Sequence, residues 1–196
     1  CTLGMTLEER YAEKYWAPKN REMAICYATS QDGISWDKPE LGLVEFEGSK
    51  ANNILWRGVE GDKDLLWGPH GAGIFKDLRD PDPERRYKAL LKSKILSVAY
   101  SEDGIHWGDA IPCPEADSAG DTHNNAFWAP TLGKYVGITR QWGKQDGSYV
   151  RQVAQTSSVD FENWEKTEIV MEGLNSNQQP YAMPVFYHGG VYIGIA

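Results

Sequence analysis

The segment from residue 121 to residue 124 carries three side chains that can do chemistry, Asp121, His123 and Asn124. A carboxylate can act as nucleophile, base or acid, and imidazole and amide groups can hydrogen-bond to hydroxyl groups. Asp121 is therefore the best single candidate for a catalytic carboxylate among these residues. The alternative is that Asp121 only caps the backbone where a strand begins.

Other chemistries have weaker signals in this sequence. A histidine such as His123 without a second nearby ligand is weak evidence for a metal, so we expect no metal and no cofactor. The sequence has no Cys/His spacing typical of zinc, no glycine-rich phosphate loop and no Gly-x-Ser-x-Gly segment. Three cysteines in 196 residues exclude a disulfide-rich protein. We expect Cys26, between two apolar residues, to be a small buried residue of a strand.

Composition narrows the possible partners and the fold class. The chain has a net charge of −8 and no Lys/Arg stripe that could neutralise phosphates, so we expect no nucleic-acid partner. No apolar run approaches the ~20 residues that a membrane-spanning helix needs, so we expect no membrane partner. Eight tryptophans, ten tyrosines and twenty glycines favour strands and tight turns, which predicts an all-β fold.

A short motif, Ser-x-Asp-x-x-x-Trp, occurs three times, at residues 30–36, 101–107 and 158–164. Each copy follows a run typical of a strand. The Ser and Asp side chains of such a turn bond to nearby backbone amides, a glycine takes the positive φ, and the tryptophan packs back on the sheet. The motif therefore predicts three hairpins that share one geometry.

Further strand candidates lie between these hairpins, at residues 72–75, 87–91, 126–128 and 134–140. Together they predict repeated units of about four strands in ~50–60 residues, which is the size of a propeller blade. Because the connections are short, each strand is expected to pair with the one before it in an antiparallel meander.

Three segments carry a resemblance to a known family: Tyr-Ala-Thr-Ser-Gln-Asp-Gly-Ile-Ser-Trp from residue 27, Asp-Thr-His-Asn-Asn-Ala-Phe-Trp from residue 121, and Tyr-Ala-Met-Pro-Val-Phe from residue 181. They resemble bacterial proteins related to the N-terminal domain of glycosyl hydrolase family 32. The resemblance implies the five-bladed β-propeller of the invertase, levansucrase and arabinanase superfamily. Five such blades need roughly 275 residues. We therefore expect residues 1–196 to form a single partial propeller domain, truncated at both ends, with roughly three to three and a half blades.

The resemblance also implies which loops surround the site. In that superfamily the catalytic funnel lies on the face formed by the hairpins between second and third strands and by the links between blades. The Ser-x-Asp turns join third and fourth strands, so their aspartates are expected to be structural. The residues expected at the funnel are Asp121 as the catalytic carboxylate and, as substrate-binding residues, His70, His123, Asn124, Arg140, Gln179 and Tyr181.

Several neighbouring residues keep two interpretations. Arg140 either clamps the substrate or orients Asp121 through a charge-assisted pair. Trp67 and Trp142 either lie under a sugar ring or pack between blades.

The sequence Arg79-Asp80-Pro81 copies an invertase motif, but it follows the first strand of its unit, so we expect a solvated charged turn. Glu115 and Asp117 lie further up their loop and are expected at its rim.

The resemblance implies a glycoside hydrolase-like protein that cleaves or transfers a glycosidic bond in a fructoside, arabinoside or related sugar. Its partner would be a carbohydrate substrate, and its second carboxylate would lie outside this chain. One alternative is a non-catalytic carbohydrate-binding propeller, favoured by the absence of the invertase motifs Trp-x-Asn-Asp-Pro-Asn-Gly and Glu-Cys-Pro and by the amide-rich segment 175–179. The other alternative is a structural propeller module.

Overall fold

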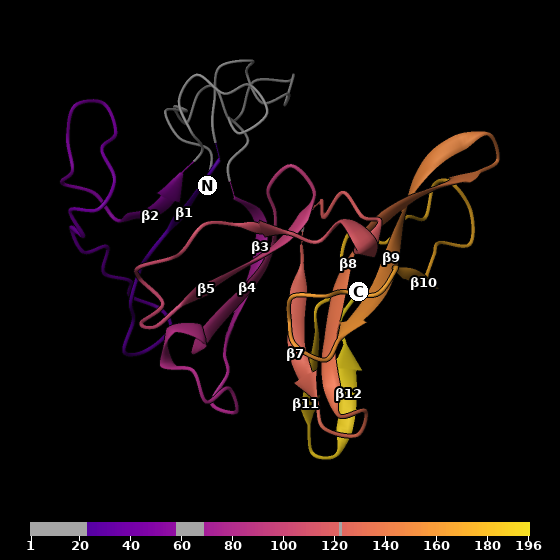
Figure 1. Ribbon diagram of the computed structural model, residues 1–196. Helices are drawn as coiled ribbons and strands as arrows, with labels where there is room; N and C mark the ends of the chain where they lie inside the picture. Colours follow the sequence, from indigo (N-terminus) through magenta and orange to yellow (C-terminus); the bar gives the residue numbers. More distant parts are fainter. Residues whose placement is uncertain (1–22, 58–68, 122) are drawn as a thin grey trace. The chain divides into compact units, whose positions relative to one another are not determined.

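The structure, a computed structural model, describes residues 23–57, 69–121 and 123–196 (Figure 1). By its internal contacts the chain divides into two compact units, Cys1–His70 and Gly71–Ala196. The described residues form antiparallel sheets, with two short 3-10 helices, η1 (Pro83–Arg85) and η2 (Pro114–Ala116), and no α-helix. The prediction of an all-β fold is confirmed. None of the described helices has the length and apolar character needed to cross a bilayer.

The described part of the first unit holds one pair of strands. Strand β1 (Ala24–Cys26) pairs antiparallel with β2 (Ile54–Arg57). One buried side chain from each strand forms a small core with two partly buried neighbours, Val44 and Phe46. The prediction that Cys26 is buried is wrong, since its side chain is exposed. It is the last residue of a three-residue strand, and the register of β1 against β2 shifts just before it.

The second unit contains two four-stranded antiparallel sheets and a hairpin (Figure 1). The first sheet has the order β3 (His70–Lys76), β4 (Tyr87–Lys92), β5 (Leu96–Ser101), β6 (Ile111–Pro112). The second has the order β7 (Asn125–Ala129), β8 (Lys134–Gln145), β9 (Ser148–Ser158), β10 (Glu168–Met171). The hairpin is β11 (Val185–His188) with β12 (Val191–Gly194). The predicted meanders are confirmed, since every strand of the two sheets pairs with its neighbours in sequence.

The main core lies between the two sheets. Buried apolar side chains from both of them form one cluster: Leu90, Leu96, Val98, Cys113, Ala116, Ala126, Tyr135, Phe161 and Trp164. The two sheets come close to each other at Gly137 in β8. A Cβ atom added there would lie 2.9 Å from the Trp164 ring and 3.0 Å from the Leu90 side chain. A glycine at this position is therefore what lets the sheets pack at native density.

The opposite face of the second sheet packs against the β11–β12 hairpin (Figure 1). Val136, Ile138 and Val153 of the sheet form a second apolar cluster with Val185 of β11. The backbone N–H of Val185 also donates a hydrogen bond of 2.8 Å to the Asn125 side chain in β7. The second sheet is thus covered on both faces where the first residues of β8 pair with the last residues of β9.

The three Ser-x-Asp turns share one hydrogen-bond pattern. In each, the Asp Oδ1 accepts bonds of 2.7–2.8 Å from two following backbone N–H groups, and the Ser Oγ accepts one of 2.8–2.9 Å. The bonds from the backbone of Ile34 and Ser35 lower the pKa of Asp32 to about 2. These contacts confirm the predicted turn geometry.

The tryptophans that end the three turns differ in burial. Trp164 is buried between the two sheets, whereas Trp36 in the first unit is 58% exposed. The third copy also differs from the other two at the residue with left-handed backbone. The first two copies have a glycine there, and the third has Phe161 with φ 68°. A non-glycine residue in this conformation costs on the order of 1 kcal/mol, and burial of the Phe161 ring in the core offsets it.

Candidate functional site

The half of the β8–β9 hairpin that lies nearest its turn brings two arginines and a tryptophan to one face of the second sheet. Arg140 and Trp142 lie two residues apart on β8, so their side chains share a face. Arg151 of β9 is the register partner of Trp142, and directly opposed residues of an antiparallel pair also share a face. This is the face on which Ile138 packs against β11. Beyond that apolar contact, the face becomes cationic and aromatic.

Arg140 is the best buried member of this group and holds two other segments in place. Its side chain is 5% exposed, and its Nη1 lies 2.9 Å from the Asp121 carboxylate. Its Nη2 donates a hydrogen bond of 2.7 Å to the backbone carbonyl of Tyr181. Charge-assisted bonds of this kind are stronger and more directional than neutral ones. Arg140 therefore fixes the approach to β7, which carries Asp121, against the segment that leads to β11.

Two aromatic rings complete the arrangement. The Arg140 guanidinium lies 4.6 Å from the centre of the Tyr181 ring, and that of Arg151 lies 5.3 Å from the centre of the Trp142 ring. His123 meets the Tyr181 ring edge to face at 5.7 Å. Both Trp142, at 45%, and Tyr181 are well exposed, so their free surface faces solvent. Cation–π contacts hold the rings, and the exposed parts remain open to a ligand.

We call Asp121, His123, Arg140, Trp142, Arg151 and Tyr181 the arginine–aromatic cluster. Gln179 borders it, since its Oε1 accepts bonds from the backbone N–H of Arg151 at 3.0 Å and from the Arg151 Nη1 at 3.3 Å. The Gln179 amide nitrogen donates to the carbonyl of Ser176 at 2.8 Å. The structure thus brings together five of the predicted residues: Asp121, His123, Arg140, Gln179 and Tyr181.

The other two predicted substrate-binding residues lie differently. Asn124 is buried, its Nδ2 donates to the carbonyls of Gly71 and Gly120, and its Oδ1 accepts a bond of 2.6 Å from Thr139. An amide engaged in this way ties β3 and the preceding loop to β8, and leaves no exposed surface for a sugar. His70 is the half-buried first residue of β3, at the boundary between the two compact units.

Arg151 was missed by the sequence reasoning, although a signal for it exists. Asp146 and Gly147 form the two-residue turn between β8 and β9, both with positive φ, as a type I′ hairpin requires. An Asp-Gly pair between two strand-like runs fixes the register of the whole hairpin. Gln145 and Ser148 flank the turn and pair with each other. Three residues beyond them, Trp142 pairs with Arg151, which places the second arginine beside the first.

The remaining candidates lie at the edge of the site or outside the described residues. Trp67 falls among the residues that the structure does not describe. Glu115 is exposed in η2, and Asp117 pairs with Lys166 at 3.0 Å on the surface. Across residues 23–57, 69–121 and 123–196, no three His, Cys, Asp or Glu side chains gather as metal ligands would.

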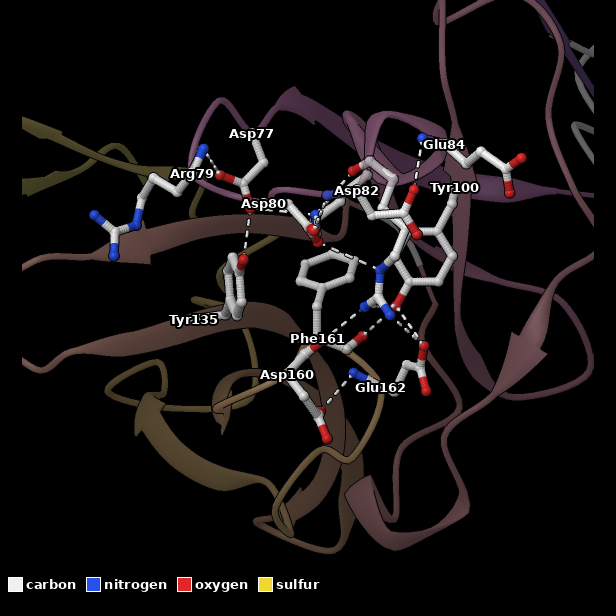
Figure 2. Close-up of polar contacts among 12 residues, drawn as sticks. Asp77, Arg79, Asp80, Asp82, Glu84, Tyr100, Tyr135, Asp160, Phe161 and Glu162 are labelled. Carbon is white, nitrogen blue, oxygen red and sulfur yellow. Dashed lines mark hydrogen bonds and ion pairs between the residues drawn. The ribbon is translucent and has the colours of Figure 1, made fainter.

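The Arg79-Asp80-Pro81 segment is exposed at Arg79 and Pro81, as expected for a solvated turn, but Asp80 is half-buried and borders a buried charged cluster (Figure 2). Lys88 of β4 is 0% exposed, and its Nζ lies 2.7 Å from Asp80 and 3.2 Å from Asp77. The Tyr135 hydroxyl points at Asp77 and donates a hydrogen bond to it. Asp77 and Asp80 lie inward because their carboxylates are the partners of a lysine on the core face of the next strand, while Arg79 and Pro81 stay exposed.

This lysine-centred cluster also joins the two sheets. Arg85 bonds to Glu162 at 2.8 Å and to the carbonyl of Asp160 at 2.8 Å, both in the turn after β9. Burial by itself raises the pKa of Asp77, but hydrogen bonds from Tyr135 and the Arg79 backbone and the charge of Lys88 outweigh it, so the pKa lies below its ordinary value. These contacts give Asp77 and Asp80 a structural role between the sheets.

Comparison of the chain with protein-family models, with curated proteins and with solved structures finds no match. The chemistry of the arginine–aromatic cluster therefore follows from its own residues and contacts: an ionised carboxylate held by a buried guanidinium, beside two exposed aromatic rings.

Proposed function

We propose that this protein is a glycoside hydrolase-like protein that acts on a fructoside, arabinoside or related sugar at the arginine–aromatic cluster. The observation that carries the proposal is the ion pair between Asp121 and the buried Arg140, placed beside the exposed rings of Trp142 and Tyr181. Exposed aromatic rings pack against the apolar faces of sugar rings, and polar side chains beside them bond to hydroxyl groups.

The role proposed for Asp121 is that of one member of the carboxylate pair of a glycosidase. A salt bridge forms with the carboxylate in its ionised state, and this is the state in which a carboxylate acts as nucleophile or base. Its side chain keeps about a quarter of its surface exposed, whereas Arg140 is buried, so Asp121 can meet a substrate while Arg140 orients it. Arg140 is thus a positioning residue in this proposal.

The architecture proposed for the complete protein is a five-bladed β-propeller. Support comes from the two successive four-stranded meanders, each with a Ser-x-Asp turn between its third and fourth strands. A third copy of the same turn lies in the first unit. Repetition of one turn at one position of a four-strand unit is what a propeller blade requires.

A second candidate function is carbohydrate binding without catalysis. The observation that favours it is Gln179, which carries an amide where the next loop could supply an acid, and whose Oε1 is occupied by Arg151. In that case Asp121 would fix the shape of the site and bond to a hydroxyl group, and no bond would be cleaved.

Sugar binding at the cluster is tested with Trp142→Ala on an array of fructan, arabinan and related oligosaccharides. Removing the ring is expected to weaken binding about tenfold, which corresponds to roughly 1.4 kcal/mol of stacking. Trp36→Ala is the matched control, because Trp36 is also exposed but lies in a turn of the first unit. Equal binding by wild type and both variants would contradict the placement of the sugar at this cluster.

A further inference from the structure

The arginine–aromatic cluster holds more positive than negative charge. Arg140 is paired with Asp121 at 2.9 Å. Arg151, by contrast, makes no ion pair with any carboxylate among the residues that the structure describes, and its recorded polar contacts go to the neutral Gln179. One guanidinium charge of the cluster is therefore left without a countercharge, in a chain whose net charge is −8.

Both arginines also keep unused hydrogen-bonding capacity. The Nε atoms of Arg140 and Arg151 are buried and have no hydrogen-bond partner within the described part of the chain. Arg151 uses its Nη1 for Gln179, which leaves most of the five N–H groups of its guanidinium without a protein acceptor. The buried Nε of Arg151 is a costly donor to leave unmet, so an acceptor-rich group that reaches this edge of the guanidinium would be stabilised there.

The position of Arg151 indicates what that group is attached to. Its guanidinium lies 5.3 Å from the Trp142 ring and 5.7 Å from the Tyr181 ring. A ligand ring that rests on these exposed aromatic surfaces would hold its substituents next to the guanidinium. A planar guanidinium fork matches the two oxygens of a carboxylate better than it matches a single hydroxyl group.

We propose that the sugar residue bound beside Arg151 carries a carboxylate, so that the ligand of this cluster is an oligosaccharide containing a uronic acid. This inference rests on the proposed function, since it takes the cluster to be a carbohydrate site, and it adds the charge of the ligand. Arg151 binds the carboxylate, Trp142 and Tyr181 contact the ring, and Arg140 remains with Asp121.

The test compares uronate-containing oligosaccharides with their methyl esters, which keep the same sugar ring and lose the charge. Both sets, together with neutral and sulfated glycans, are titrated against the complete protein at low and at high salt. We expect the acids to bind about tenfold more tightly than their esters at low salt, with a smaller difference at high salt because salt screens the pairing. Arg151→Gln should remove the preference. Lys144→Gln, which loses the same charge on the same hairpin beside Tyr149, should keep it.

The outcomes separate this inference from the proposed function. Esters or neutral glycans that bind as tightly as the acids would overturn the inference and leave carbohydrate binding in place. A preference for sulfated glycans over uronates would overturn the assignment of a carboxylate, and retention of the acid preference in Arg151→Gln would overturn the role of Arg151. If no glycan of any set binds, the proposed function itself is refuted.

Discussion

Lys88 is expected to be the most sensitive single position of the interior. The substitution Lys88→Met keeps an unbranched side chain, one atom shorter, and removes the charge that Asp77 and Asp80 share at 3.2 and 2.7 Å. Removing one partner of a buried ion pair leaves the other charge without compensation, which costs about 3–5 kcal/mol. Arg85 remains 3.3 Å from Asp80 and limits the loss at that carboxylate, so most of the penalty falls on the buried Asp77.

The assay is urea unfolding of the complete protein followed by tryptophan fluorescence, which gives the free energy of unfolding from midpoint and slope. Lys92→Met is the matched control. It makes the same exchange on the same strand at a half-buried position where none of the described residues pairs with the lysine, and it is expected to change stability by about 0.5 kcal/mol or less. A loss below about 1 kcal/mol in Lys88→Met at neutral pH would refute a stabilising role for the lysine-centred cluster.

The pH dependence gives a second check on the same variant. The pKa values of Asp77 and Asp80 are lowered in the folded wild type, chiefly because hydrogen bonds and Lys88 outweigh the raising effect of burial. Their contribution is therefore present above the unfolded pKa of about 3.9 and is lost as the pH falls through the folded value. In Lys88→Met burial remains and the lysine does not, so the carboxylates protonate more easily. The difference between wild type and variant should shrink as the pH approaches 4, and a difference independent of pH would contradict this account.

Two further predictions concern the thiols and the repeated turn. In a Cys1→Ser background, Cys26 should react at once with a thiol reagent because it is exposed. Burial raises the pKa of the Cys113 thiol to about 12, so Cys113 should react only as the protein unfolds. Two fast thiols in the folded protein would contradict this. Asp160→Ala should cost about 1–2 kcal/mol in urea unfolding, by analogy with helix caps, because Oδ1 accepts two backbone N–H bonds of 2.8 Å; an unchanged midpoint would show that the turn forms without them.

Local features of this fold could be predicted from the sequence because local chemistry determines them. The Ser-x-Asp turns formed as expected, since Ser, Asp and a left-handed residue at fixed spacing satisfy one another within seven residues. The meander order followed from short connections between strand-like runs. Asp121 and Tyr181 could be brought to one place because both were assigned to loops on the same face of the fold.

Features that depend on contacts between distant segments could not be predicted in this way. The exposed turn around Asp80 was predicted but the inward position of Asp80 was not, because nothing local shows that Lys88 is its buried partner or that Tyr135 donates to its neighbour Asp77. The burial of Trp164 and the exposure of Trp36 differ although their turns match, because only the second unit places two described sheets around the ring. The role of Asn124 likewise depends on carbonyls and a hydroxyl group that only the folded chain assembles.

The pairing of Asp121 with Arg140 bears on how the site is tested. Since Arg140 is buried, Asp121→Asn leaves its charge without a full partner and is expected to lower stability as well as activity. A loss of turnover therefore has to be measured where the variant is folded, and sugar binding has to be measured beside it. Asp109→Asn is the control for the substitution itself, because Asp109 is exposed and pairs with no other residue in the described ranges.

The measurement that tests the central claim most directly is the kcat of Asp121→Asn, in the complete protein, on the fructan or arabinan oligosaccharide that the proposed function predicts the wild type to cleave. Fluorescence first confirms that the variant is folded at the assay temperature. We predict that kcat falls by about 10²–10⁴-fold, as expected for loss of a catalytic carboxylate, while the affinity for the sugar changes only a few-fold. A folded variant that binds the sugar and turns it over within about tenfold of wild type would contradict a catalytic role for Asp121.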